Sequence, residues 1–330
     1  MYTTVQVLRN IIYAAAARGG NLKQLTLAAG LRLNQLHDSE YKVEGVAPVI
    51  GLWEEVLSST GDPSFGLHFG KQYNPSMLGL LGFLIQSCRN LGDAYQHLEK
   101  YQELVSGWIT YKLVQHKNQC EIHYTVNPVW QHASPHTAKQ ALENAMSASL
   151  TSHGLLTQSK DYPLYAELSY PQSVPVVIHE KVFGCPIAFG KAHNKLVFAA
   201  DFAQRPLVNY DQSLYMSFSS MLKEKLVSFA VNESFAKELQ NIIIRDFLGH
   251  APKLAIISAH LNMSERSFQR KLQIEDKTYR SIITDLKKEL AFTLLKNDAH
   301  NRSTVSALLG YAEPTAFYRA FKKWKKPVYG

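Results

Sequence analysis

The sequence predicts an α+β domain followed by an all-α domain, in which a long helix joins two helix-turn-helix units. Three observations lead to this prediction. Before residue 211, segments with helical apolar spacing are mixed with segments in which apolar residues alternate. Near the C-terminus one short pattern of residues occurs twice. The segment that holds this repeat also carries all of the chain's excess positive charge.

The length of 330 residues allows about two or three domains, and an apolar content of 46% is enough for a buried core. We place an α+β domain at residues 1–211 and a helical connector at 212–233. An all-α domain then covers 234–330. Its helix-turn-helix units lie at about 252–272 and 301–323.

The first 60 residues read as helices, because Val5, Leu8, Ile11 and Ile12 keep helical spacing. Residues 22–36 superficially resemble a helix-turn-helix, but only Lys23 and Arg32 are basic there, which favours a plain helical pair. An apolar run at 78–85 and an amphipathic helix at 90–104 follow.

The apolar period then changes to two, which indicates strands. Lys117-Asn118 fits the turn of a hairpin. A helix is expected at 137–155. The alternating segments are 108–114, 121–126, 165–170 and 196–200.

The connector shows helical register from Leu214 to Phe229. The seam between the domains is expected at 232–234, where Ser234 can cap the helix that follows.

The repeated pattern runs from Ile257 to Ser264 and again from Val305 to Ala312. Asn262 and Gly310 occupy its turn, and these residue types adopt the left-handed conformation most readily. Each copy is followed by a Phe-x-Arg motif that ends in an apolar residue, at 268–272 and 317–321. The predicted core residues are Ile257, Leu261, Phe268 and Leu272 in the first copy and Val305, Leu309, Phe317 and Phe321 in the second.

The second helix of the first unit has the side chains that a DNA-reading helix needs. Ser264 is its expected N-cap. Arg266, Gln269 and Arg270 share one outward face, and Arg to guanine or Gln to adenine are strong bidentate pairings. For any one of them, a surface charge paired with an acid such as Glu265 is an equally good interpretation. The candidate DNA contacts are Ser264, Glu265, Arg266, Ser267, Gln269 and Arg270.

The second helix-turn-helix is expected to contribute less to base recognition, because the outer face of its second helix has fewer side chains that can donate two hydrogen bonds to one base. Pro314 suits the first turn of its helix. The candidate contacts are Thr315, Tyr318, Arg319 and Lys322, with the lysines positioned on phosphates. Between the units, residues 279–296 form an apolar-striped helix that spans about 27 Å. Such a rod would hold the two reading helices roughly one turn of DNA apart, about 34 Å.

The charge is divided unevenly along the chain. Sixteen of its 35 Lys and Arg residues and eight of its 27 acidic residues lie in 240–330, so this segment has a net charge of +8 and the remainder is neutral. A basic module beside a neutral domain is the electrostatic pattern of a DNA-binding protein.

These motifs resemble the DNA-binding domain of AraC-type transcription regulators over Leu254–Tyr329. The resemblance rests on Leu309-Gly310-Tyr311, Thr315-Ala316-Phe317 and residues 319–324. Ser258 and Ser306 stand where the family usually has alanine, and the segment after Trp324 is shorter than usual. The resemblance implies double-stranded operator or promoter DNA as the partner.

The front of the chain resembles the arabinose-binding-type domain of one branch of that family. The matching pieces include Gly61-Asp62-Pro63 with Gly66-Leu67, residues 183–187, and Arg205-Pro206-Leu207. The resemblance implies that the domain at 1–211 senses a small-molecule effector, forms a homodimer, or does both, beside a DNA-binding domain at 234–330. RNA polymerase is a further expected partner, and no cofactor is expected. Four aromatic residues are candidates for the effector pocket, although strand aromatics are more often plain core. They are Trp108, Tyr111, Tyr124 and Trp130.

Other chemistry finds little support in the sequence. Cys88, Cys120 and Cys185 form no disulfide or thiolate zinc pattern, and Cys185 reads as a buried small residue. His132 and His136 stand four apart, but Pro135 interrupts a helix across them, so no metal site is expected. No catalytic motif occurs. No membrane span or secretion signal is expected, which places the protein in the bacterial cytoplasm.

Two other functions were considered beside that of a sequence-specific transcription regulator. One is an enzyme whose front domain modifies a small molecule while the basic domain tethers it to DNA. The other is a DNA-packaging protein, which would bind all duplexes equally with a steep salt dependence.

Overall fold

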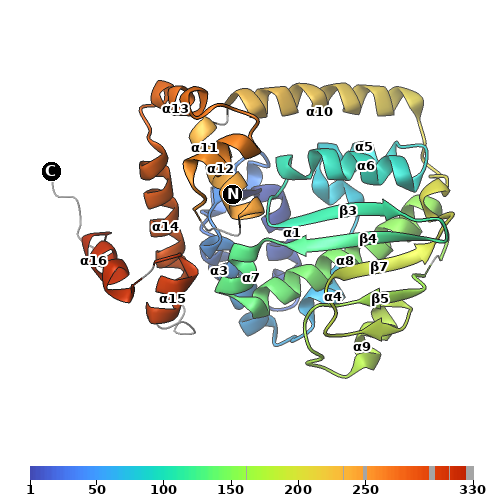
Figure 1. Cartoon of the computed structure of the whole chain (residues 1–330). Coiled ribbons are helices and arrows are strands. Elements are labelled where there is room, and N and C mark those ends of the chain that lie inside the picture. The colour runs from blue at the N-terminus through green and yellow to red at the C-terminus, as the bar shows by residue number, and fades with distance from the viewer. Residues whose placement is uncertain (161, 233, 248–250, 297–301, 312, 325–330) are drawn as a thin grey trace. The chain divides into compact units, whose positions relative to one another are not determined.

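The computed structural model describes residues 1–160, 162–232, 234–247, 251–296, 302–311 and 313–324 (Figure 1). The chain divides into two units: Met1–Trp130 with Ser134–Ser228, and Phe229–Gly330 with Gln131–Ala133. The first contains the strands and the second is helical, so the predicted α+β domain followed by an all-α domain is confirmed. The division falls in the last turn of α10 (Gln212–Asn232).

The first unit begins with α1 (Val5–Ala16), α2 (Leu22–Ala28), the 3-10 helix η1 (Leu33–His37) and α3 (Ala47–Thr60). The helices expected before residue 60 are therefore present. Two short strands were missed: β1 (Tyr2–Thr4) pairs antiparallel with β2 (Lys42–Glu44). Strands of three residues are too short to show an alternating pattern, and their pairing is decided by the tertiary fold.

A five-stranded sheet forms the centre of the first unit, in the order β3-β4-β7-β5-β6. All neighbouring strands are antiparallel except β5 and β6, which are parallel. The alternating segments predicted four of these five strands, and the expected hairpin joins β3 to β4. The strands are β3 (Ile109–Gln115), β4 (Gln119–Val126), β5 (Tyr165–Glu167), β6 (Ile187–Ala188) and β7 (Asn194–Ala199).

The strand expected to reach Tyr170 ends at Glu167 instead. The backbone N–H of Ser169 donates to the side chain of Asn194, at the start of β7, 2.8 Å away, rather than to a backbone carbonyl of that strand. The hydroxyl of Tyr170 turns to Glu143 in α8. A side-chain bond of this kind competes with the sheet and cannot be read from alternation alone.

Helices cover one face of the sheet, with α8 (Pro135–Thr157) running along it and α4 (Phe65–Gly70) beside α8 (Figure 1). On β4 the side chains of Cys120, Ile122 and Tyr124 are buried, whereas Thr125 on the other face is exposed. The remaining elements of this unit are η2 (Pro75–Leu78), α5 (Leu80–Gln86), α6 (Leu91–Tyr101), η3 (Gln102–Leu104), α9 (Val176–Phe183) and η4 (Phe202–Gln204). The helix α7 (Pro128–Ala133) is divided, because its residues 131–133 group with the second unit.

Glycines permit α4 to approach α8 closely. A Cβ atom on Gly66 would lie 2.1 Å from the carbonyl oxygen of Gln140, and one on Gly70 would lie 2.4 Å from Cβ of Ser147. Polar contacts fix the same surface: the Gln140 side chain accepts from the backbone N–H of Gly66 at 2.9 Å, and the Ser147 hydroxyl donates to the carbonyl of Leu67 at 2.9 Å.

The other face of the sheet carries a charged cluster around Glu121. Its carboxylate lies 2.9 Å from Nζ of Lys195 on β7 and 2.6 Å from Nε2 of His123. Burial alone would raise the pKa of Glu121, but the hydrogen bonds from Lys195 and His123 outweigh it and lower the pKa to about 2.

The second unit consists of α11 (Phe235–Asp246) and two short helix pairs on either side of α14 (Tyr279–Lys296). The pairs are α12 (Leu254–His260) with α13 (Glu265–Ile274), and α15 (Arg302–Leu308) with α16 (Pro314–Trp324). The long helix has the predicted bounds. The predicted cap of α11 is confirmed, because Oγ of Ser234 accepts from the backbone N–H of Lys237.

Replacement of Gly66 by alanine is expected to destabilise the first unit by about 2–3 kcal/mol, because the new methyl group must push α4 away from α8. Gly154→Ala is the matched control. Its Cβ atom would meet Ser159 at an ordinary 3.6 Å within α8, so helix propensity should leave stability unchanged or raise it by up to about 1 kcal/mol. Urea unfolding followed by circular dichroism compares the two. Equal stability of both variants would contradict the close packing.

The Glu121 cluster predicts a specific loss of stability in acid. Because the folded pKa of about 2 lies below the ordinary value of 4.5, the carboxylate stabilises the fold above pH 4.5 and loses this effect as the pH falls toward 2. Glu121→Gln should therefore flatten the pH dependence of the unfolding free energy in that window. An unchanged slope in the variant would show that Glu121 contributes nothing to it.

Candidate functional site

The first helix-turn-helix is held together by the predicted apolar residues. Ile257, Phe268 and Leu272 are buried, and Leu261 is half-buried. Asn262 has a φ of +53°, so the turn contains the left-handed residue that the sequence predicted. The backbone N–H groups of Asn262 and Met263 close the turn on α12 by donating to the carbonyls of Ala259 and Ser258, both at 2.9 Å.

The start of α13 is capped as expected, since Oγ of Ser264 accepts from the backbone N–H of Ser267 at 3.2 Å. Glu265, Arg266, Gln269 and Arg270 are exposed, and Ser267 is half-buried. Within the described parts of the chain, neither arginine forms an ion pair. The alternative in which Glu265 neutralises one of these arginines therefore finds no contact in the structure.

The inner side of α13 is fixed by three aromatic rings. Phe268 is fully buried, and its ring centre lies 5.4 Å from that of Phe235 in α11 and 5.7 Å from that of Tyr279 in α14. The ammonium group of Lys271 lies over the Phe235 ring at 4.9 Å from its centre. Lys271 therefore turns toward α11, unlike the two arginines.

Glu275, which follows α13, has a role that sequence reasoning missed. Its carboxylate accepts hydrogen bonds from the backbone N–H groups of Phe235 and Ala236, the latter at 3.0 Å. A carboxylate is favourable at the positive N-terminal end of a helix. The contact joins residues about 40 positions apart, so no local pattern could have indicated it.

The second helix-turn-helix repeats this construction. Val305, Leu309, Phe317 and Phe321 are buried, as predicted. Gly310 has a φ of +67°, and Pro314 begins α16. Thr315, Tyr318, Arg319 and Lys322 are all exposed. Residue 312 of the repeat and the shortened end at 325–330 lie outside the described residues.

The long helix α14 packs against both helix-turn-helix pairs through one stripe of buried side chains: Ile282, Leu286, Leu290, Ala291 and Leu294. At its start Tyr279 contacts Phe268, and further along Phe292 contacts Phe321 of α16. The ammonium group of Lys287 lies 4.3 Å from the centre of the Tyr311 ring, and burial lowers its pKa. Lys287 is a second residue that the sequence did not single out.

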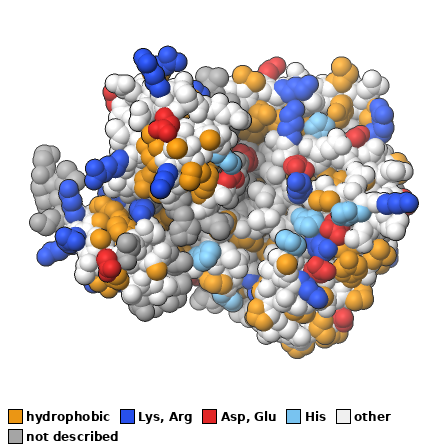
Figure 2. All heavy atoms as spheres, in the orientation of Figure 1, with side chains coloured by type: hydrophobic (Ala, Val, Ile, Leu, Met, Phe, Trp, Pro, Cys, Tyr) orange, Lys and Arg blue, Asp and Glu red, His pale blue; other side chains and the backbone are white. Residues whose placement is uncertain are grey.

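Figure 2 shows Lys and Arg side chains at the surface over α13, α14 and α16. The exposed basic residues of these helices include Arg266, Arg270, Arg280, Lys288, Arg319, Lys322 and Lys323. A surface with this charge attracts the phosphate backbone of a nucleic acid.

Two neighbouring cavities of about 110 and 130 Å³ lie inside the first unit. Three of the four aromatic candidates are in their walls: Trp108 and Trp130 line the smaller cavity, and Tyr111 lines both. Tyr124 instead packs edge-to-face against Tyr111, with ring centres 5.4 Å apart. The residues common to both walls are Val7, Leu78, Leu98, Tyr111, Asn144 and Ala145.

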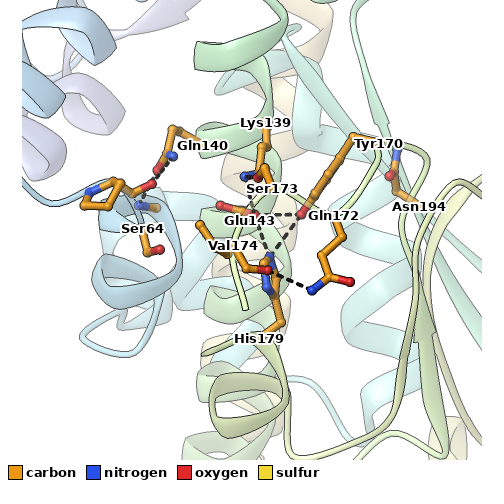
Figure 3. A network of polar contacts seen from close by, with 12 residues as sticks. Ser64, Lys139, Gln140, Glu143, Tyr170, Gln172, Ser173, Val174, His179 and Asn194 are labelled. Atoms are coloured by element: carbon orange, nitrogen blue, oxygen red, sulfur yellow. Dashed lines mark hydrogen bonds and ion pairs between the residues drawn. The ribbon is translucent and has the colours of Figure 1, made fainter. Parts of the chain in front are cut away.

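A buried polar cluster in the same unit was not predicted (Figure 3). Oε1 of Glu143 in α8 accepts from the Tyr170 hydroxyl at 2.7 Å and lies 2.8 Å from Nε2 of His179 in α9. Lys139 lies 3.6 Å from the same oxygen and donates to Ser173. Glu143 and His179 are at most 1% exposed. These contacts attach α9 and the segment before it to α8.

The cysteines and histidines show no further site. All three cysteines are buried, and burial raises the pKa of Cys88 and Cys185 to about 12 and that of Cys120 to about 11. His132 and His136 belong to different helices. Among the described residues, no cluster of three His, Cys, Asp or Glu side chains is arranged to hold a metal ion. None of the helices in the described ranges is both long and apolar enough to cross a bilayer.

Two family models match the chain. The arabinose-binding domain of AraC transcription regulators, N-terminal, matches residues 19–207, and a helix-turn-helix domain matches residues 257–326.

Known proteins with similar sequences are transcriptional regulators. The regulator VqsM of Pseudomonas aeruginosa is 25% identical over 278 residues, which cover 83% of this chain and 84% of VqsM. The ornithine utilization regulator of the same organism is 24% identical, over 80% of this chain and 76% of the relative. The crystal structure of CdpR from P. aeruginosa aligns with a TM-score of 0.45 and 18% identity, over 86% of this chain and 90% of CdpR.

Proposed function

This chain belongs to the AraC transcription regulators with an arabinose-binding-type N-terminal domain. From that premise we propose which helices contact the DNA bases and where a small-molecule effector binds. The protein is a sequence-specific DNA-binding regulator. The proposed base contacts come from α13 and α16, and the proposed control comes from a small molecule bound inside the first unit. Effector control is typical of this family.

The observation that carries the DNA contacts is the outward face of α13, whose arginines form no ion pair with any other described residue. Arg266, Gln269 and Arg270 are exposed beside a capped helix start, and their inner neighbour Phe268 is fully buried. Reading helices enter the major groove with the residues near their N-terminal ends facing the bases. We assign base choice to these three side chains and a supporting role to Ser264, Glu265 and Ser267.

In α16 we assign base or phosphate contacts to Thr315, Tyr318 and Arg319, and a phosphate contact to Lys322. Phosphate contacts supply affinity that falls as salt rises, whereas base contacts supply specificity. The rod-like α14 supports a spacing of about one helical turn of DNA between α13 and α16.

We further propose that the protein acts as a homodimer. Met216 (63% exposed) and Val227 (64%) lie about three turns apart on one side of α10. Leu214 (49%) and Met221 (51%) form a second exposed pair on the opposite side. Hydrophobic side chains over α10 are visible at the surface in Figure 2. Exposed apolar residues of this kind mark an interaction surface, and we assign the interface to the side of Met216 and Val227.

RNA polymerase is a further proposed partner, since a regulator bound at a promoter acts by helping or hindering that enzyme. The proposed location is the bacterial cytoplasm, on the nucleoid when DNA is bound. We assign no catalytic activity and no cofactor, which agrees with the regulatory function of the relatives.

Arg270→Ala is expected to reduce discrimination among DNA sites by about 1–3 kcal/mol, because the variant loses one bidentate base contact. Fluorescence anisotropy of the full chain measures this, with duplexes selected by the chain itself from a random pool and with scrambled duplexes. Lys271→Ala is the control, since Lys271 lies over Phe235 on the same helix. An Arg270→Ala variant with unchanged affinity and preference would refute the assignment, and equal affinity of the unaltered chain for all duplexes would indicate a packaging protein.

The double substitution Met216→Glu with Val227→Glu is expected to convert the dimer into a monomer, because two carboxylates cannot be buried against a second copy without a counterion. Light scattering after size-exclusion chromatography gives the mass. Leu155→Glu introduces a carboxylate at another exposed leucine, 48% accessible on α8, and should leave the dimer intact. A dimer that survives the α10 substitutions would place the interface elsewhere.

A further inference from the structure

We propose that the two cavities beside α8 together bind one uncharged, largely apolar molecule whose only polar group is a hydroxyl or an equivalent donor and acceptor. The inference rests on the proposed effector control and specifies the chemical class of the effector. The proposed class excludes sugars, amino acids and carboxylates as ligands of this site.

The space exists because one face of α8 is built from small residues. Ala141, Ala145 and Ala148 line the cavities, together with Ser149 and Ser152. Protein interiors are normally packed with few voids larger than a water molecule. Here the aromatic rings opposite α8 do not fill the room that its short side chains leave.

The shape of the space suits an elongated ligand. The two cavities share Asn144, Ala145 and Tyr111, so they are neighbours along α8. Their α8 wall residues run from Ala141 to Leu156, which corresponds to about 22 Å of helix. For comparison, an engineered apolar cavity of about 150 Å³ in another protein accepts benzene.

The walls exclude charge. None of the residues that line either cavity is Lys, Arg, Asp or Glu. His153 lines the larger cavity, but its Nε2 is already 2.7 Å from the Tyr95 hydroxyl. An ionised carboxylate or ammonium group would therefore be buried without a dedicated counterion, which is strongly unfavourable. An amino acid or a fatty acid anion does not fit this site.

Several polar side chains of the walls already have partners within the protein, which leaves few for the many hydroxyl groups of a sugar. The amide of Gln102 is occupied, since its Oε1 accepts from the backbone N–H of Tyr111 at 2.7 Å. The hydroxyl of Tyr95 lies 2.7 Å from Nε2 of His153. A sugar would bury several hydroxyl groups that find no partner here.

Three polar atoms of the walls remain for a polar group of the ligand. Oδ1 of Asn144, Nε1 of Trp108 and Oγ1 of Thr3 are buried and have no hydrogen-bond partner among the described residues. Asn144 lines both cavities, and Trp108 and Thr3 line the smaller one. Buried polar groups are almost always paired in proteins. One acceptor and one donor match a hydroxyl, which both donates and accepts.

The test uses the full-length chain and the neutral fluorophore N-phenyl-1-naphthylamine as a reporter of the cavity. The fluorophore should be displaced by n-octanol at concentrations at least about tenfold lower than by n-octanoate, and L-leucine and L-arabinose should not displace it. Ala145→Leu fills the space shared by both cavities and should weaken n-octanol binding by about tenfold or more. Leu155→Ala, on an exposed position of the same helix, is the control.

A second variant tests the polar atom without filling the cavity. The methyl ether of n-octanol cannot donate a hydrogen bond, so the unaltered chain should prefer the alcohol. In the Asn144→Leu variant the alcohol and the ether should bind with nearly equal affinity, and the ether should still bind. The measurement remains decisive if Ala145→Leu fails to fold.

Several results would overturn the inference: n-octanol binding unchanged in a folded Ala145→Leu variant, an alcohol preference unchanged in Asn144→Leu, or tighter binding of the sugar, the amino acid or the carboxylate. DNA binding is measured in parallel. A chain that selects DNA sites but binds no neutral probe would disprove this inference alone, whereas one that binds n-octanol but no DNA would disprove the proposed regulator.

Discussion

The burial of Phe268 and Phe317 is the constraint on which the DNA-facing surface depends. Both rings are fully buried, and at 3.6 residues per turn a residue two positions further along a helix points about 200° away. Arg270 and Arg319 must therefore face outward once the two phenylalanines are packed. The repeated Phe-x-Arg motif thus encodes a buried anchor and an outward-facing arginine in three consecutive positions.

A buried phenylalanine of each helix pair contacts α14, which gives that helix its importance. Phe268 packs against Tyr279 near its start, and Phe321 packs against Phe292 further along. Because α13 and α16 both rest on α14, a displacement of either one would disturb the same buried stripe. Glu275 adds a second attachment, since it binds the N-terminal end of α11, the helix through which the chain enters the second unit.

The first unit is organised around α8 and uses its sides in opposite ways. Toward α4, glycines bring the two helices into contact so close that a methyl group would not fit at Gly66. Along its cavity-lining side, alanine and serine leave space that the surrounding rings do not fill. The first arrangement supplies rigidity and the second supplies room for a ligand. A helix that is firmly held elsewhere can tolerate a poorly filled side, because the loss of packing is local.

The sequence by itself determined the division into an α+β part and a helical part, four strands of the larger sheet, the bounds of the long helix and the turns at Asn262 and Gly310. These features follow from periodicity and from the conformational preferences of single residues, which act over a few positions along the chain. Only the tertiary structure decided the pairing of β1 with β2, the end of β5 at Glu167, the Glu143–His179 pair, the attachment of Glu275 to α11 and the cavities beside α8. Each of these depends on residues far apart in sequence meeting in space, or on volume that their side chains fail to fill, and neither leaves a local pattern.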